Sequence, residues 1–251
     1  MIKVMICGIL GRMGAIIADI VTKNPDLDLV GGVDIRSGQL FGKPVLESSN
    51  IQTFIDTYKP DVMIDFTIAS ATLINAKVAA KNNVALIIGT TGFTPDQESE
   101  LLNSIKNVPA IKTTNFSIGM NIFWDIIGKA AKKLKDYDIE IIEAHHRNKK
   151  DAPSGTAKTI LKVIKDEIGD LDEVYARNGI TERGNEIGVH VIRGGDIVGD
   201  HTVQFHKNYE TIEFTHRAYD RSVFAHGAVC AAMWIYKKEP GMYTMKDVLG
   251  I

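Results

Sequence analysis

The sequence has few cysteines, no long hydrophobic run and no excess of charge of either sign. Its two cysteines, Cys7 and Cys230, lie far apart among 251 residues, too few for the disulfide framework of a small secreted protein. No stretch approaches the roughly 18 continuous apolar residues of a membrane helix. The short apolar start ends at Gly8 and lacks the length and cleavage site of a signal peptide. These absences predict a cytoplasmic protein with no membrane partner.

The charges nearly cancel, with 29 Lys and Arg against 31 Asp and Glu, a formal net charge of -2. Such a balance gives no reason to expect nucleic acid as a partner. Hydrophobic residues make up 45% of the chain, as in ordinary globular proteins, and no internal repeat or charge block occurs. We therefore expect one large domain or two modest ones.

Segments of strand and helix character alternate through the first half. This alternation is typical of a parallel sheet with helices on both faces, so we expect an α/β fold with a Rossmann-type doubly wound sheet. Strands are expected at 2–7, 29–34, 62–66, 84–89 and 110–113, and helices at 12–23, 69–82 and 95–106.

The second half changes character and predicts a second, α+β domain with a mixed or antiparallel sheet. Helices are expected at 117–134, with Ser117 as N-cap, at 154–168 and at 228–237. A strand is expected at 138–143, and three more at 188–193, 201–206 and 211–216 form an antiparallel meander. We expect a dinucleotide-binding domain at 1–116, to which 227–251 returns, and a second domain at 117–226.

The 22 glycines include a triplet, Gly8, Gly11 and Gly14, between the first strand and the first helix. This spacing is a variant of the dinucleotide fingerprint, in which glycines allow a tight turn and close approach of backbone to a pyrophosphate. Asp34 follows Gly14 by 20 residues, where an acid holds the ribose hydroxyls. The alternative is a plain glycine turn. The Asp34 carboxylate favours NADH, while Arg36 leaves NADPH open.

Two further polar segments end strands of the expected sheet. Gly89-Thr90-Thr91 follows one strand, and Thr113-Thr114-Asn115-Phe116 follows the next. Loops after parallel strands meet at the ligand crevice of a doubly wound sheet. Both segments are therefore candidate cofactor contacts, although a strand-ending turn is the simpler interpretation of the first.

The densest polar segment, 143–156, carries two histidines, an arginine and two lysines. A solvated basic turn is the simplest interpretation. Metal binding is not expected, because the adjacent histidines lack a ligand-spaced partner. Ser154 is a natural N-cap, and Gly155 and Thr156 add first-turn N–H groups that bind carboxylate or phosphate. We therefore predict a small polyanionic substrate, protonated by His145 or Lys149.

A third polar loop, 193–201, contains several glycines and aspartates. It joins two strands of the expected meander. Covering the substrate and simply connecting a hairpin are equally compatible with its sequence.

Together these segments resemble the dihydrodipicolinate reductase family over almost the whole chain. The block from His145-His146-Arg147 to Ser154-Gly155-Thr156 is specific, whereas the glycine loop is not. The matching segments are 8–14, 89–93, 115–119, 143–147, Lys149, 151–157 and 194–202.

The resemblance implies NAD(P)H-dependent reduction of 4-hydroxy-tetrahydrodipicolinate, a cyclic dicarboxylate, in the diaminopimelate route to lysine. It also implies a homotetramer assembled through the sheet of the second domain. His145 then resembles the proton donor/acceptor and Lys149 the second donor, while His146, Gly155 and Thr156 contact substrate carboxylates. The implied cofactor shell comprises Gly8, Ile9, Leu10, Gly11, Arg12, Met13, Asp34, Gly89, Thr90, Thr91, Thr113, Thr114, Asn115 and Phe116.

Three positions depart from the family pattern. Ile35 stands where an arginine often follows the cofactor acid, which puts strong NADPH use in doubt. Thr113-Thr114 replaces smaller residues, and Cys230 occupies a position where arginine is common. The last change removes a charge on the cofactor side or between the domains.

Two rival functions use the same features. One is another NAD-dependent dehydrogenase of similar build; a semialdehyde enzyme would need a nucleophilic cysteine, and neither Cys7 nor Cys230 is well placed. The other is a non-catalytic NAD-sensing protein, which would need a partner-binding region that the balanced charge does not offer.

Overall fold

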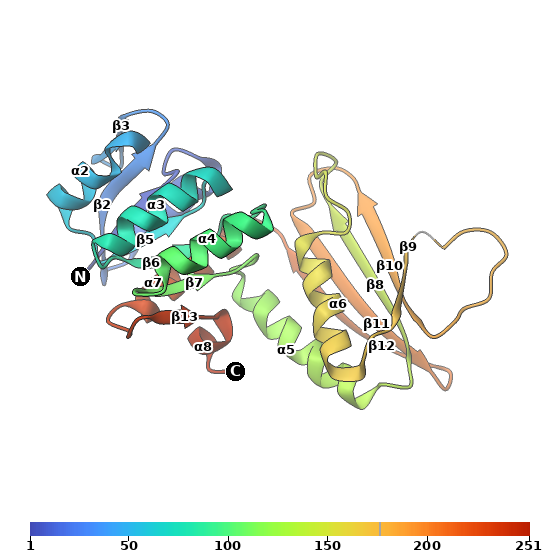
Figure 1. The fold of residues 1–251 in the computed structure, drawn as a ribbon. Helices are drawn as coiled ribbons and strands as arrows, with labels where there is room; N and C mark the ends of the chain where they lie inside the picture. Colours follow the sequence, from blue (N-terminus) through green and yellow to red (C-terminus); the bar gives the residue numbers. More distant parts are fainter. Residues whose placement is uncertain (176) are drawn as a thin grey trace. The chain divides into compact units, whose positions relative to one another are not determined.

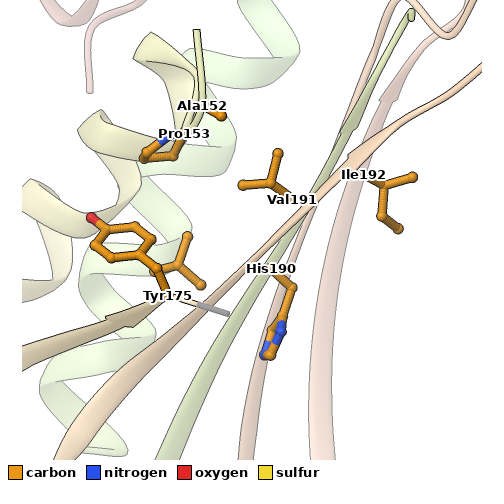
Figure 2. Close-up of a pocket in the computed structure, with 7 residues that line it drawn as sticks. Ala152, Pro153, Tyr175, His190, Val191 and Ile192 are labelled. Atoms are coloured by element: carbon orange, nitrogen blue, oxygen red, sulfur yellow. The ribbon is translucent and has the colours of Figure 1, made fainter. Parts of the chain in front are cut away.

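The computed structural model describes residues 1–175 and 177–251, which divide into two compact units. Unit 1 consists of Met1–Ile118 together with Ser222–Ile251, and unit 2 is the intervening Gly119–Arg221. Each unit contains one sheet with helices packed on it (Figure 1). Among the described residues, no helix is both long and apolar enough to cross a lipid bilayer.

Unit 1 has an eight-stranded sheet in the order β13-β7-β6-β5-β1-β2-β4-β3. Every neighbouring pair is parallel except β3 with β4. The chain begins in the middle of this sheet and builds outward in both directions, so β1 and β5 flank the point where ligands bind in such folds. The strands are β1 (Ile2–Cys7), β2 (Leu27–Asp34), β3 (Gly38–Leu40), β4 (Lys43–Glu47), β5 (Val62–Asp65), β6 (Ala85–Ile88), β7 (Pro109–Lys112) and β13 (Gly241–Tyr243).

Helices cover both faces of this sheet, and alternate residues of β1 show how. Val4 and Ile6 pack with buried residues of α1, α7 and α8, whereas Met5 and Cys7 pack with those of α2, α3 and α4. This alternation follows from the two-residue period of a strand and gives the doubly wound architecture. The helices are α1 (Arg12–Lys23), η1 (Ser48–Asn50), α2 (Ile51–Tyr58), α3 (Ala69–Lys81), α4 (Pro95–Ile105), α7 (Ser222–Ile235) and α8 (Met245–Leu249).

Several of these elements have no counterpart among the sequence expectations. The segment 38–58 forms β3, β4, η1 and α2, and the C-terminal segment adds β13 beside β7 and the short helix α8. Most are only three to five residues long, so their hydrophobic pattern is too short to show a period. The exception is α2, where buried Ile51, Phe54 and Ile55 have helical spacing.

Unit 2 has a five-stranded mixed sheet in the order β12-β11-β8-β10-β9. Ile139 and Ile141 of β8 lie in a core with apolar residues of α5 and α6. The elements are α5 (Ile118–Lys133), which begins at the end of unit 1, β8 (Asp138–His145), α6 (Gly155–Ile168), β9 (Asp172–Tyr175), β10 (Glu186–Arg193), β11 (Gly199–Lys207) and β12 (Glu210–Ala218).

The prediction of an antiparallel meander of three strands is wrong for the first of them, β10. β11 and β12 do pair antiparallel, but β10 pairs in parallel with β8 and β9 and is separated from β11 by β8. The loop between β10 and β11 therefore crosses β8 and is not a hairpin. Short half-buried strands carry no local signal for their neighbours, because the partner is chosen by packing across the whole sheet.

Candidate active site

The glycine loop lies between β1 and α1, as the fingerprint predicts. Gly8 has φ of +75°, in the left-handed region, and a Cβ at Gly14 would lie 2.0 Å from the carbonyl oxygen of Gly8. Glycine at both positions therefore lets the loop turn tightly onto the start of the helix. The N-cap, Gly11, has no side chain to cap the helix, so the first-turn N–H groups of α1 suit a pyrophosphate.

Asp34 ends β2 and is bonded to the glycine loop. Its Oδ2 accepts a hydrogen bond from the N–H of Leu10 at 2.9 Å, and its Oδ1 accepts one from the N–H of Ile35 at 2.7 Å. These bonds hold the carboxylate beside the loop, where the acid of a dinucleotide site contacts ribose. The Ile35 side chain is 83% exposed and offers no charge to a phosphate.

A buried carboxylate at the end of β5 links two loops, and sequence reasoning missed it. Asp65 is fully buried, and its Oδ1 accepts hydrogen bonds from Thr67, Thr72 and Thr90 at 2.6–3.1 Å. Its Oδ2 accepts one from the side-chain amide of Asn75 at 2.9 Å. The available signal was the segment 65–67 directly after a buried strand. Only the strand order shows that this strand adjoins β1.

The other expected cofactor residues follow β6 and β7 at the same edge of the sheet. Thr90 is buried in the Asp65 network, whereas Thr91 and Thr114 are exposed. Asn115 accepts a hydrogen bond from the N–H of Ser117 through its Oδ1 at 2.9 Å. Ile9 and Phe116 are core residues, 0% and 1% exposed, so neither presents a side chain to a ligand. The remaining loop residues, Arg12 and Met13, begin α1.

In unit 2, the polar segment of the sequence begins on β8 and ends on α6. Glu143 is fully buried, and the Nδ1 atom of His145 lies 2.8 Å from its Oε2. Alternation along the strand puts both side chains on the same face. His201 of β11 also faces this pair, with its ring centroid 5.1 Å from that of His145. Sequence reasoning missed Glu143 and His201 as members of the cluster.

Ser154 is the N-cap of α6, as expected. Its Oγ accepts a hydrogen bond from the N–H of Ala157 at 3.1 Å and lies 3.2 Å from Nε2 of His201. Gly155, which is exposed, and Thr156, which is 9% exposed, open the helix. A Cβ at Gly155 would meet nothing within 4 Å. The helix start therefore has space for an anion beside the histidine cluster.

Lys149 and His146 lie in the loop between β8 and α6. The Lys149 ammonium is 2.8 Å from the Asp151 carboxylate, and the Lys149 N–H donates to the carbonyl of His146 at 3.0 Å. Burial raises the pKa of Asp151, but the hydrogen bond and charge of Lys149 outweigh it and lower that pKa overall. The lysine side chain is 21% exposed, so the ammonium is accessible to a substrate.

The loop that crosses β8 is attached to this segment by its backbone. The N–H of Gly194 donates to the carbonyl of His145 at 3.0 Å, and the N–H of Arg147 donates to that of Gly195 at 3.2 Å. These bonds support the position of His145. They also give the 194–198 connection a structural role that the sequence left open.

Glu143 and His201, the two buried groups beside His145, both have lowered pKa values, but for different reasons. Burial favours a raised pKa for Glu143, yet hydrogen bonds from His145, Ser154 and Arg193 outweigh it and hold this pKa well below its ordinary value. Burial, assisted by the charge of His145, lowers the pKa of His201 to about 3. Near neutral pH the cluster therefore contains an ionised carboxylate and a neutral His201.

Among the described residues, Glu143, His145 and His201 have ligand atoms within 4.8 Å of one another. Such a set contains donor types that suit a transition metal. However, Oε1 of Glu143 already accepts two N–H groups, from Ser154 and Arg193. Metal binding through Oε2 would have to displace its contact with His145, so the bonding favours proton chemistry.

Comparison with known proteins identifies relatives of both parts of the chain. The family model for the N-terminus of dihydrodipicolinate reductase matches residues 2–116, and the model for its C-terminus matches residues 119–249. The 4-hydroxy-tetrahydrodipicolinate reductase of Methanocorpusculum labreanum is 70% identical over 251 residues, covering all of both chains. That of Methanoregula boonei is 58% identical and covers 100% of this chain and 99% of the relative.

A solved structure has the same fold. The dipicolinate-bound dihydrodipicolinate reductase from Paenisporosarcina sp. TG-14 superposes with a TM-score of 0.81 and 26% identity, covering 97% of each chain. The matches therefore extend over both units and agree with the mixed α/β architecture.

Proposed function

Because the chain belongs to the dihydrodipicolinate reductase family, we propose the following chemistry for its site. The protein is an NAD(P)H-dependent oxidoreductase that reduces 4-hydroxy-tetrahydrodipicolinate to tetrahydrodipicolinate in the diaminopimelate route to lysine. One hydride and one proton enter the ring system, and one water leaves. The main support for this function is the 70% identity, over the full length of both chains, to a 4-hydroxy-tetrahydrodipicolinate reductase.

Unit 1 is proposed to bind the cofactor. The glycine loop would hold the pyrophosphate at the start of α1, and Asp34 would hold the adenosine ribose. Loops after β5, β6 and β7 would surround the nicotinamide end. The bound NAD(P)H supplies the hydride. The chain's own contribution is a loop geometry already formed by Gly8, Gly14 and the Asp65 network.

We favour NADH as the preferred cofactor. An ionised carboxylate near the ribose hydroxyls repels a 2′-phosphate. Asp34 is held beside the glycine loop by two N–H groups, and the next residue, Ile35, carries no charge. Arg36 is exposed and is the remaining nearby cation for NADPH.

Unit 2 is proposed to bind the cyclic dicarboxylate. Ser154, Gly155 and Thr156 present the start of α6 to one carboxylate, and His146 contacts the other. A helix N-terminus favours an anion through its N–H groups and its dipole. The related structure bound to dipicolinate, which is a cyclic dicarboxylate, supports this assignment of substrate class.

His145 and Lys149 are the proposed proton donors. Hydride addition leaves negative charge on the ring, which a positioned acid must neutralise. His145 is supported by the Glu143 carboxylate at 2.8 Å, and Lys149 holds its ammonium beside Asp151. Both groups belong to one short segment, 145–151, next to the proposed carboxylate site.

The proposal also includes a cytoplasmic homotetramer assembled through the sheet of unit 2. Residues on one face of that sheet, such as Ile141 and Val189, pack in the core with α5 and α6. Ile142 and Ile192 alternate with them along β8 and β10, and Ile192 is 51% exposed. The exposed Ile192 side chain on this otherwise mixed face suits an interface between copies, and mass by light scattering tests the assembly.

The function is tested by following loss of nicotinamide absorbance with freshly generated 4-hydroxy-tetrahydrodipicolinate. We expect substrate-dependent oxidation of NADH, with weaker oxidation of NADPH. A reaction without substrate is the control for spontaneous oxidation. If neither cofactor is oxidised by well-folded protein, the proposed reaction is wrong; if NADPH is the better cofactor, only the preference for NADH is wrong.

A further inference from the structure

The carboxylate of Glu143 contacts groups from four segments of unit 2. It lies on β8 with His145, and it accepts hydrogen bonds from the N–H of Ser154 before α6 and from the guanidinium of Arg193 at the end of β10. The ring of His201 on β11 lies nearby, with its Nε2 3.8 Å from the carboxylate. The Glu143 side chain is 0% exposed. A buried charge is costly unless it is paired and hydrogen-bonded, so all of these partners matter for its orientation.

The two oxygens of Glu143 have different partners. Oε1 accepts the Ser154 N–H at 2.9 Å and the Nη2 of Arg193 at 3.0 Å. Oε2 lies 2.8 Å from Nδ1 of His145 and 3.8 Å from Nε2 of His201. Backbone amides and guanidinium groups only donate, so the Oε1 position requires an acceptor.

Arg193 keeps the carboxylate in this orientation. Its Nη2 also donates to the carbonyl of Asp151 at 2.6 Å, and its Nη1 donates to that of Ile192 at 2.8 Å. Arg193 stands opposite His145 in the parallel register of β10 and β8. The guanidinium therefore joins the loop before α6 to Glu143 and leaves Oε2 directed at the histidine.

We propose that Glu143 is a positioning residue that directs His145 and the start of α6 at the same time. Through Oε2 it holds a proton on Nδ1 of His145, so that Nε2 is the atom that exchanges a proton with substrate. Through Oε1 it fixes the Ser154 N–H, and with it the turn that is proposed to bind a carboxylate. This inference rests on the proposed role of His145 in the reduction.

The chemistry requires this arrangement because a histidine donates from Nε2 as an imidazolium. Loss of the Nε2 proton then leaves a neutral ring that keeps its proton on Nδ1. The ionised Glu143, whose Oε2 lies 2.8 Å from Nδ1, favours a proton on that nitrogen in both states and stabilises the positive one. The neighbouring charged and titratable groups are Arg193, which is paired with Glu143, His201, and Lys149 with its partner Asp151.

Glu143→Gln separates this role from a merely structural one. The amide oxygen must take the Oε1 position, because two donors point there. The amide nitrogen then takes the Oε2 position and donates to Nδ1 of His145. The neutral ring is forced to carry its proton on Nε2, and the imidazolium loses its acceptor. The bonds to Ser154 and Arg193 are retained, so the fold and the start of α6 should persist.

The experiment is NMR of protein labelled with 15N at histidine, in the wild type and in E143Q. We expect neutral His145 to be the Nδ1–H tautomer in the wild type and the Nε2–H tautomer in E143Q. The signal is assigned by its loss in His145→Gln. In the reductase assay, kcat of E143Q should fall by about 10²-fold or more, while KM for the dicarboxylate changes by less than about threefold.

Glu140→Gln is the matched control. Glu140 lies on the same strand but on its other face, where it contacts Nε2 of His190 at 2.8 Å. This variant should alter the His190 signal and leave the His145 tautomer and kcat unchanged, with the oligomeric mass verified. Retention of the Nδ1–H tautomer in folded E143Q overturns the proposal, as does unchanged kcat. The tautomer is measured without substrate, so absence of turnover by the wild type refutes only the proposed function.

Discussion

Asp34 is the residue whose substitution most directly tests the preference for NADH over NADPH. Asp34→Asn removes the negative charge while an amide oxygen can still accept the Leu10 N–H. We expect the ratio of kcat/KM for NADPH to that for NADH to rise about tenfold, the equivalent of about 1.4 kcal/mol. Steady-state kinetics with both cofactors measure the ratio. Asp19→Asn, which removes an exposed partner of Lys23, is the control, and an equal ratio in both variants would contradict the role of Asp34.

Lys149 is the second residue whose role can be isolated. Lys149→Met keeps the aliphatic chain and removes the ammonium that pairs with Asp151. Because positioned acids contribute about 10²–10⁴-fold to proton transfer, we expect kcat to fall by that order while NADH affinity is retained. Lys158→Met changes an exposed lysine on α6 and controls for charge. Unchanged kcat in Lys149→Met would exclude this lysine as a proton donor.

At the scale of elements, the junction of β1 and α1 depends on the absence of a side chain at Gly14. In Gly14→Ala the new Cβ would lie 2.0 Å from the Gly8 carbonyl oxygen, so the helix must shift away from the strand. We expect the free energy of unfolding to fall by about 1–3 kcal/mol and NADH binding to weaken. Urea unfolding and fluorescence titration measure the two effects.

The control for this element is Gly38→Ala. A Cβ there would meet nothing within 4 Å, and Gly38 does not have a positive φ. That variant should retain both stability and NADH binding. If Gly14→Ala behaves like Gly38→Ala, the close approach of helix and strand is not what the glycine loop requires.

For the whole molecule, buried histidines and Glu143 predict sensitivity to acid. The pKa of His201 falls from 6.5 to about 3 on folding because burial disfavours its charged form, and burial also lowers the pKa of His216. As pH drops below 6.5, the unfolded chain binds these protons first, so stability is lost. The pKa of Glu143 is also lowered on folding, from an ordinary value of 4.5. The folded protein therefore loses further stability as the pH falls below about 4.5.

Each such proton lowers the free energy of unfolding by about 1.4 kcal/mol per pH unit. Urea unfolding at pH values above and below 6.5 measures this slope, which should be smaller in His201→Asn. His226→Gln, at an exposed position, should keep the wild-type slope. Equal slopes in all three proteins would show that His201 does not carry the acid sensitivity.

Local sequence by itself determined the glycine loop, the Asp34 position, the cap at Ser154 and the alternation of elements in unit 1. Each depends on residues within about 20 positions of one another, where turn geometry, capping and hydrophobic period operate. The family resemblance added the reaction, and the matching relatives confirm it. The roles of His145 and Lys149 stay predictions.

The tertiary structure decided which strands are neighbours. Only the order β5-β1 places the Asp65 network beside the glycine loop, and only the order β11-β8-β10 gathers His201, Glu143 and Arg193 from positions up to 58 residues apart. The sequence instead predicted a meander in which β10 would pair directly with β11, whereas β8 lies between them. Strand pairing is decided by packing of whole faces in the folded chain, and no local pattern records it.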